Sequence, residues 1–294
     1  MIYKKWSNKT ELMTGMNVDD TLLLGTEDKA NWFVEEIAKK FNITVQKTVK
    51  KHLGVNYDWG SDEKGPYADA SMKEYEEDIW QSYERIKNKK IKEWETPGYP
   101  GTTLVKGNHE VAEDATNYRH IVGKAMFWNQ KMGVECNNST RELSRFMQNP
   151  GPEHWKALER YCGYLKGIPF DRLRYRAPEQ LRSVTYFDSN FAQNPDDRLS
   201  VTGIYETLDD AGVVHTTSQG QRVVSKSSTE AEYMAGSHAA DGMVFTTNLI
   251  NELLGEGTMK KPGLLCGDNQ GSLYLMNNMQ VGKGQSISTL GLTI

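Results

Sequence analysis

The N-terminal part of the chain contains two short apolar runs separated by polar residues. Within residues 12–25 the polar break holds Asp19 and Asp20, so the pattern predicts a hairpin with a carboxylate pair at its bend. An Asp-rich turn without further role is the alternative interpretation of this pair. Apolar residues on one face predict a helix over residues 27–41, and a β-like segment follows at 48–55.

The middle of the chain combines a polar stretch with helical patterns. Residues 58–65 are polar and rich in turn-forming residues. Between residues 72 and 91, apolar side chains recur at three- and four-residue steps, which predicts a helix whose apolar stripe serves packing. A Pro- and Gly-rich break at 96–101 precedes further helical patterns, and Pro152 marks the start of one helix. We expect His154, in that helix, to be a structural side chain.

The C-terminal part begins with strand patterns and continues with a long helix. Four segments rich in β-branched and aromatic residues are strand candidates, at 181–188, 200–207, 212–216 and 221–225. A long helical pattern follows and stops at Gly255, and a strand at 264–268 leads into a helix at 270–276. Strands followed by alternating helix and strand predict an α/β fold in which helices cover a sheet.

Three acidic residues stand at or near the ends of these C-terminal elements. Asp188 ends the first strand candidate, Glu232 lies near the start of the long helix, and Asp268 ends the later strand. We expect all three to meet at one edge of the sheet. A capping box, in which Thr229 caps the helix and Glu232 completes the motif, is the alternative role for Glu232.

Composition limits the class of protein without selecting a function. The 294 residues suffice for one large domain or two of ordinary size, and 37% hydrophobic with 25% charged residues is typical of a soluble globular chain. No apolar run approaches the roughly 18 residues of a membrane span. Three scattered cysteines without CxxC spacing predict a reducing compartment and no zinc site. The net charge of −4 does not indicate nucleic-acid binding, and local basic clusters such as 85–92 are interpreted as solvated faces or, alternatively, as a phosphate-binding patch.

The N-terminal hairpin and the residues after it resemble a known family. Val18-Asp19-Asp20, a helix that ends in Lys39-Lys40-Phe41, and the run 51–54 are similar to the back half of the reverse transcriptase palm of copia-type retrotransposons. This resemblance implies that Asp19 and Asp20 bind metal. The family reads Y-V-D-D, and Asn17 occupies the Tyr position here. A polymerase also needs an upstream Asp and the fingers, which residues 1–16 do not supply, so we expect no polymerase activity from this chain alone.

The rest of the chain resembles the following parts of the same polyprotein. The stretch from 144 to 167 is similar to the copia-type connection segment, and four later runs are similar to the RNase H patterns D-x-D-W-A-G, D-R-x-S-x-S-G, S-S-T-E-A-E-Y and C-D-N-Q. These runs are 188–193, 197–203, 227–233 and 266–270. The resemblance implies that Asp188, Glu232 and Asp268 are catalytic residues that bind Mg²⁺ or Mn²⁺.

The resemblance also implies a division of the chain. We expect a partial reverse transcriptase palm at 1–60, a helical thumb and connection at 61–175, and an RNase H-like domain at 176–294 with a mixed sheet, flanking helices and a truncated C-terminus. The family has K-H-I-D near its C-terminus, and its Asp is a fourth metal ligand. The matching region 281–288 has no acid. We therefore expect cleavage that is weak, dependent on Mn²⁺, or absent.

The expected function is that of a retrotransposon-derived endoribonuclease that hydrolyses RNA in RNA–DNA hybrids by two-metal catalysis. Lys, Arg and polar turn residues such as Ser200 and Thr202 are expected to hold the phosphates. The expected partners are nucleic acid and the remainder of a Pol polyprotein, in the cytoplasm or nucleus and without a membrane. A catalytically dead relic of a transposable element, which serves as a nucleic-acid-binding or assembly module, is the alternative. A polymerase completed by another chain is a third interpretation.

Overall fold

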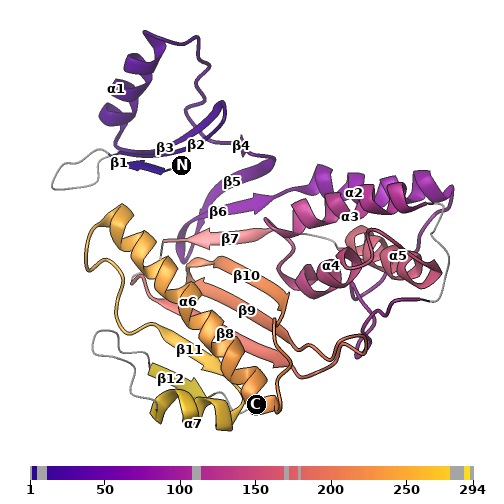
Figure 1. The fold of residues 1–294 in the computed structure, drawn as a ribbon. Helices are drawn as coiled ribbons and strands as arrows, with labels where there is room; N and C mark the ends of the chain where they lie inside the picture. The colour runs from indigo at the N-terminus through magenta and orange to yellow at the C-terminus, as the bar shows by residue number, and fades with distance from the viewer. Residues whose placement is uncertain are drawn as a thin grey trace.

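The structure is a computed structural model that describes residues 2–4, 12–107, 114–168, 172–177, 180–278 and 288–291. These residues form three separate sheets, of three, four and five strands, together with helices that pack on the two larger sheets (Figure 1). The fold is thus mixed α/β, as the sequence predicts. The division into palm, connection and RNase H-like parts remains a prediction.

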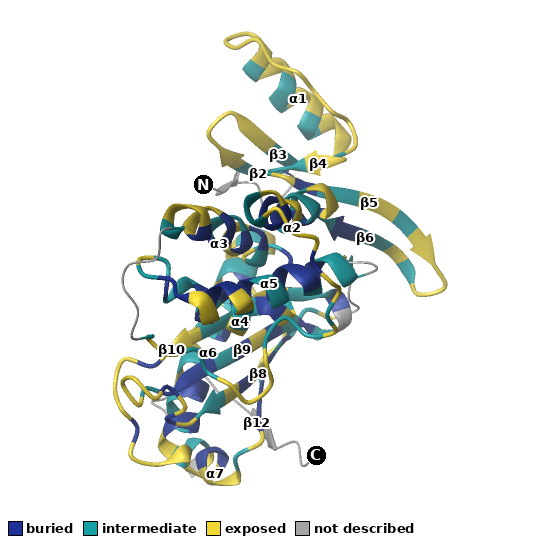
Figure 2. Ribbon diagram, turned by 90° about the vertical axis from the view of Figure 1, so that its right-hand side faces the viewer, coloured by how far each residue is buried: buried dark blue, intermediate teal, exposed yellow. Residues whose placement is uncertain are grey.

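The N-terminal hairpin forms as predicted. Strands β1 (Ile2–Lys4), β2 (Leu12–Asn17) and β3 (Asp20–Gly25) make an antiparallel sheet, and Asn17 pairs with Asp20 across the bend. Helix α1 (Glu27–Ala38) follows and ends three residues before the predicted Phe41. None of the α1 residues is buried, and Figure 2 shows this helix standing at one end of the molecule.

The second sheet corrects the prediction for residues 48–65. In place of a strand over 48–55, only β4 (Lys51–His52) forms before a turn at Leu53–Gly54. The polar stretch 58–65 is then largely strand, because β5 (Val55–Asp62) and β6 (Gly65–Ser71) make a hairpin. Strand β7 (Leu173–Arg176) completes the order β4-β5-β6-β7.

A pair of charged side chains explains why β7 joins this sheet. Arg174 on β7 donates to both carboxylate oxygens of Asp69 on β6, at 2.7 Å each, and Asp69 is almost fully buried. A bidentate charge-assisted pair of this kind fixes geometry as well as adding energy. The partner strand lies about a hundred residues away in the sequence, so the local pattern at 58–65 could not reveal it.

The helices of the middle region form one layer around a large core. They are α2 (Lys73–Lys87), α3 (Ala115–Asn129), the 3₁₀ turn η1 (Val134–Cys136), α4 (Asn137–Ser144) and α5 (Pro152–Gly167). The predicted stripe of α2 faces this core, with Ile79 and Tyr83 buried, and Leu158, Tyr161 and Leu165 of α5 are buried in it as well. Figure 2 shows the buried faces of α3 and α5 meeting at this core.

His154 has the structural role that the sequence predicts. Its ring is buried and stacks on Phe146, with the ring centroids 3.8 Å apart. Its Nδ1 accepts a hydrogen bond from the Gly151 backbone N–H at 2.7 Å, and its Nε2 donates to the Val105 carbonyl at 3.0 Å. Both ring nitrogens therefore form hydrogen bonds that stabilise the N-terminus of α5.

The third sheet carries Asp188 in one of its strands, and Asp268 directly follows another. Its strands are β8 (Ser183–Asn190), β9 (Val201–Leu208), β10 (Val213–Gly220), β11 (Leu264–Gly267) and β12 (Ser288–Gly291), in the order β10-β9-β8-β11-β12. The first three pair antiparallel, and β8, β11 and β12 run parallel.

Helices cover one face of this sheet. A 3₁₀ turn, η2 (Asp209–Ala211), joins β9 and β10, and α6 (Ser228–Leu254) crosses the sheet before α7 (Gln270–Asn278) (Figure 1). Ala235, Ala239 and Met243 of α6 pack on Phe187 and Leu265, which makes the core beneath the sheet.

Two local predictions near the start of α6 are wrong. Residues 221–225 form no strand, because β10 ends at Gly220 and the buried Gln221 side chain donates hydrogen bonds to Thr202 Oγ1 and the Ala231 carbonyl. The helix is capped by Ser227, whose hydroxyl accepts from the Glu230 backbone N–H at 3.1 Å. Glu232 therefore has no capping role.

Candidate metal centre

Strand register places Asp188 and Asp268 side by side. Strands β8 and β11 are parallel neighbours, and Cys266 is paired with Tyr186. Extended by two residues, just past the end of β11 at Gly267, this register puts position 268 level with position 188. Parallel strands bring their carboxyl ends to the same edge of a sheet. The two aspartates therefore meet because of pairing between segments about 80 residues apart.

A close contact beneath the site determines how near β11 can lie. A Cβ atom added at Gly267 would overlap the ring of Phe187, and one added at Gly236 of α6 would overlap Met276. At Gly236 the overlapping atom is the end of a flexible side chain, whereas at Gly267 it belongs to an aromatic ring, so Gly267 is the position that requires glycine for close approach. Gly267 directly precedes Asp268, so the approach of β11 to Phe187 also sets the position of that carboxylate.

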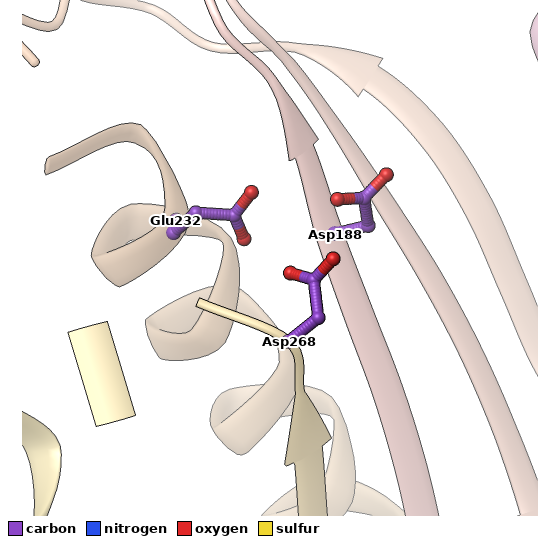
Figure 3. A group of neighbouring side chains, drawn as sticks. All are labelled: Asp188, Glu232 and Asp268. Carbon is purple, nitrogen blue, oxygen red and sulfur yellow. The ribbon is translucent and has the colours of Figure 1, made fainter. Parts of the chain in front are cut away.

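Glu232 completes the group from the second turn of α6. Its side chain is buried, and its Oε1 accepts a hydrogen bond from the Ser189 backbone N–H at 3.1 Å. Each of Asp188, Glu232 and Asp268 offers one oxygen, and these oxygens lie within 4.8 Å of one another (Figure 3). We refer to these three residues as the carboxylate triad.

The electrostatics of the triad favour a bound cation. Burial, the negative charge of Asp188 and that of Asp268 raise the pKa of Glu232 to about 7, against the opposing hydrogen bond from Ser189. Among the described residues, no Lys, Arg or His side chain lies within 4.0 Å of the triad carboxylates. Within the described part of the chain, no cationic side chain therefore offsets the repulsion between these carboxylates.

The residues present fit a divalent metal ion. The Oε2 atom of Glu232 is buried and has no hydrogen-bond partner among the described residues. A buried acceptor without a donor is costly, and such an exception needs an explanation. A hard cation such as Mg²⁺ or Mn²⁺ would satisfy this oxygen together with one from each aspartate.

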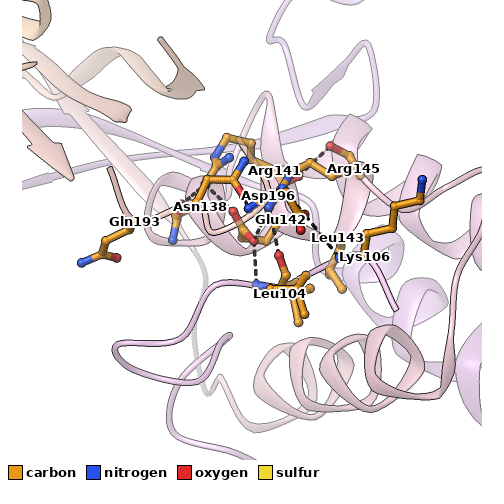
Figure 4. A network of polar contacts seen from close by, with 12 residues as sticks. Leu104, Lys106, Asn138, Arg141, Glu142, Leu143, Arg145, Gln193 and Asp196 are labelled. Carbon is orange, nitrogen blue, oxygen red and sulfur yellow. Dashed lines mark hydrogen bonds and ion pairs between the residues drawn. The ribbon is translucent and has the colours of Figure 1, made fainter. Parts of the chain in front are cut away.

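The loop after β8 is fixed by a polar network that reaches into the helical layer (Figure 4). Arg145, at the end of α4, donates to the Leu104 carbonyl and to Glu142 Oε2, both at 3.1 Å. It also donates to Asn194 Oδ1 at 3.0 Å and to Asp196 Oδ2 at 3.3 Å. The loop that leaves Asp188 is therefore held by a helix from a different part of the sequence.

Four other residues that the sequence analysis singled out are not part of this site. They are the predicted phosphate-binding residues Ser200 and Thr202 and the predicted metal-binding residues Asp19 and Asp20. Ser200 and Thr202 are fully buried. Ser200 Oγ accepts a hydrogen bond from the Ala192 backbone N–H, and Thr202 Oγ1 accepts one from the Gln221 side chain. Their hydroxyls are occupied inside the protein, so the prediction that they grip phosphate is wrong. Asp19 and Asp20 are exposed at the β2–β3 bend and do not belong to the described metal-binding group.

The region that corresponds to the family's fourth acid lies almost entirely outside the described residues, since 281–287 are not described. Within the described residues, sequence reasoning missed Asn190 as a component of the site's surroundings. Its Oδ1 is buried without a hydrogen-bond partner, and its Nδ2 donates to Gln193 at 2.5 Å. Asn190 occupies the second acidic position of the D-x-D pattern, which is the signal that could have identified it.

The chain is similar in sequence to Pol polyproteins of transposons. No family model matches it. The chain is 28% identical to the retrovirus-related Pol polyprotein from transposon RE1 of Arabidopsis thaliana over 264 residues, which is 89% of this chain and 17% of that protein. It is 30% identical to the corresponding protein from transposon TNT 1-94 of Nicotiana tabacum over 61% of this chain and 13% of that protein.

A further relative is much shorter. The chain is 37% identical to the secreted RxLR effector protein 161 of Plasmopara viticola over 130 residues, which cover 44% of this chain and 91% of that protein. The chain spans 17% of the RE1 polyprotein and 13% of the TNT 1-94 polyprotein, which is about a sixth of their length or less. In the described residues, no helix is both long enough and apolar enough to cross a bilayer.

Proposed function

Since the chain belongs to the copia-type retrovirus-related Pol polyproteins of transposons, we propose that its carboxylate triad is the centre of an RNase H-type endoribonuclease acting on RNA–DNA hybrids. The observation that carries this proposal is the convergence of Asp188, Glu232 and Asp268, whose oxygens lie within 4.8 Å of one another. The proposed nuclease part is 176–294, with a partial palm at 1–60 and a thumb and connection at 61–175.

The triad residues would hold Mg²⁺ or Mn²⁺. Bound there, a metal pair supplies an activated water and relieves charge on the leaving 3′ oxygen of the RNA. The protein's own contribution is positioning. The Ser189 N–H orients the Glu232 carboxylate, and the register of β8 with β11 sets the separation of the two aspartates. We infer that the shape of the hybrid and its 2′-hydroxyls determine substrate choice.

The test is cleavage of an end-labelled RNA–DNA hybrid by the full chain in Mg²⁺ and in Mn²⁺. We expect metal-dependent cleavage of the RNA strand and a loss of at least about 100-fold in the Asp188→Asn variant, because a metal ligand is removed. The matched control is Asp19→Asn, a substitution of the same kind at an exposed acid outside the triad. Equal activity of Asp188→Asn and wild type would contradict the proposal.

A second candidate function is a nucleic-acid-binding or assembly module without catalysis. The observation that favours it is the absence of Asp and Glu from residues 281–288, where the family has its fourth acid. If folded protein binds the hybrid in Mg²⁺ and in Mn²⁺ and cleaves it in neither, this second function replaces the first.

A further inference from the structure

A buried amide side chain connects β8 and α6, two of the elements that carry the carboxylate triad. Gln221 follows directly after β10, and only 2% of it is exposed. Its Nε2 atom donates hydrogen bonds at 2.9 Å to the Ala231 carbonyl of α6, at 3.1 Å to Thr202 Oγ1 of β9 and at 3.2 Å to Ser189 Oγ of β8. One side chain thus links two strands of the third sheet to the helix that covers it.

Two of the three acceptors belong to the immediate neighbours of triad residues. Ser189 follows Asp188, and Ala231 precedes Glu232. Ser189 also donates its backbone N–H to Glu232 Oε1 at 3.1 Å. Gln221 therefore binds the residue that donates to Glu232 as well as the residue that precedes Glu232.

The chemistry of these contacts requires an amide at position 221. The Ala231 carbonyl can only accept a hydrogen bond, so the nitrogen end of the amide must face it. At the other end, Gln221 Oε1 accepts a hydrogen bond from Ser225 Oγ at 3.0 Å, which favours the same orientation. A carboxylate would place an oxygen against the carbonyl, and an apolar side chain would remove the donor from the carbonyl and from the Ser189 hydroxyl.

Repulsion within the triad gives these neutral contacts a task. The three carboxylates point toward one another, with one oxygen of each within 4.8 Å of the others (Figure 3). Like charges at this separation repel each other, which favours movement of Glu232 away from the two aspartates. Hydrogen bonds to the neighbours of Glu232 oppose this movement. A metal ion then meets ligands that are already in place, so less of its binding free energy is used to bring them together.

We propose that Gln221 is a positioning residue of the metal centre, which keeps Glu232 within reach of an ion bound by Asp188 and Asp268. In this role it contacts neither the metal nor the substrate. The inference rests on the proposed function, because it requires that the triad binds a divalent ion. It adds to that function a residue outside the triad on which metal affinity depends.

The test is the affinity of the folded full chain for Mn²⁺, measured by electron paramagnetic resonance of the free ion. Gln221→Met keeps the length of the side chain and removes its hydrogen bonds. We expect this variant to bind Mn²⁺ at least about tenfold more weakly than wild type, since residues that only orient metal ligands are worth roughly 10–100-fold. A residue with a merely structural role would lower the midpoint of urea denaturation and leave the Mn²⁺ affinity of the folded protein unchanged.

Thr202→Val is the matched control. It keeps the shape of a buried side chain and removes one hydrogen bond of the same amide, without removing the two bonds to the neighbours of triad residues. We expect its Mn²⁺ affinity to stay within about twofold of wild type. Equal losses of affinity in Thr202→Val and Gln221→Met would mean that the network only stabilises the fold, and the proposal would be overturned.

Ser225→Ala provides a second variant in case Gln221→Met does not fold. It removes the donor that orients the amide, and we expect it to weaken Mn²⁺ binding at least about threefold. Unchanged affinity in Gln221→Met, or in Ser225→Ala where only that variant folds, overturns the proposal.

Asp188→Asn distinguishes failure of this inference from failure of the proposed function. If wild type binds Mn²⁺ and Asp188→Asn does not, the ion is bound at the triad, and an unaffected Gln221→Met then overturns the positioning role alone. If wild type binds no Mn²⁺, the positioning role is overturned together with the metal centre of the proposed function.

Discussion

Glu232 is a buried acid that the fold keeps close to two other acids. In an unfolded chain its pKa is near the ordinary 4.5, and in the folded protein it is about 7. Between these values the folded protein keeps a proton that the unfolded chain has released. The contribution of this residue to stability is therefore highest at low pH and declines as the pH rises through 7.

Because the ionised Glu232 carboxylate destabilises the folded protein at high pH, we make a prediction for Glu232→Gln, which keeps the shape of the side chain and removes its charge. In chelator at pH 8, the variant should have a free energy of unfolding about 1–3 kcal/mol higher than that of wild type, and at pH 4.5 the two should be equal. Urea denaturation at both pH values measures this. Adding Mg²⁺ should stabilise wild type and not the variant. Equal stability at pH 8 would show that the charge of Glu232 carries no cost.

The loop between β8 and β9 depends on a neighbouring element for its shape. Ala192 and Arg198 in this loop have φ values of +49° and +58°, a left-handed conformation that costs about 1–3 kcal/mol per residue and persists only when the surroundings impose it. The bonds from Arg145 to Asn194 and Asp196 supply that constraint from α4. The end of β8, and with it Asp188, is thereby tied to the helical layer.

We predict that Arg145→Ala lowers the free energy of unfolding by about 2–4 kcal/mol, because it leaves the buried Glu142 carboxylate with one fewer cationic partner. The control is Lys156→Ala, which removes an exposed ion pair with Glu153 and should change stability by at most about 0.5 kcal/mol. Urea denaturation at neutral pH compares them. Similar losses in both variants would mean that the Arg145 network adds nothing beyond a surface pair.

At the scale of the whole molecule, the two predicted groups of metal-binding acids are separate. The triad lies where β8 and the end of β11 meet the first turns of α6, whereas Asp19 and Asp20 lie at the exposed bend of the N-terminal sheet (Figure 1). Any metal chemistry of the triad is therefore independent of the N-terminal hairpin.

The prediction is that replacing both Asp19 and Asp20 by Asn leaves Mn²⁺ affinity at the triad within about twofold of wild type. Asp268→Asn should lower this affinity at least about tenfold, since even residues that only orient ligands are worth 10–100-fold. Electron paramagnetic resonance of free Mn²⁺ during titration measures both. Loss of affinity in the hairpin variant, with Asp268→Asn unaffected, would place the metal site at the hairpin.

The sequence by itself determined the elements whose signals are local. Alternation and turn residues defined the hairpin at 12–25, and helical periodicity defined α5 and α6, because these patterns report which face of one element is apolar. The chemical character of Asp188, Glu232 and Asp268 was also evident, since carboxylates are the ligands that hard cations require.

Only the tertiary structure decided how distant segments pair. It placed β7 beside β6, it set Asp268 level with Asp188 through the register of β8 and β11, and it capped α6 with Ser227 in place of Thr229. It also buried Ser200, which the sequence had assigned to a phosphate contact. Strand register and burial depend on contacts between residues far apart in the chain, and a local pattern of hydrophobic and polar positions does not contain that information.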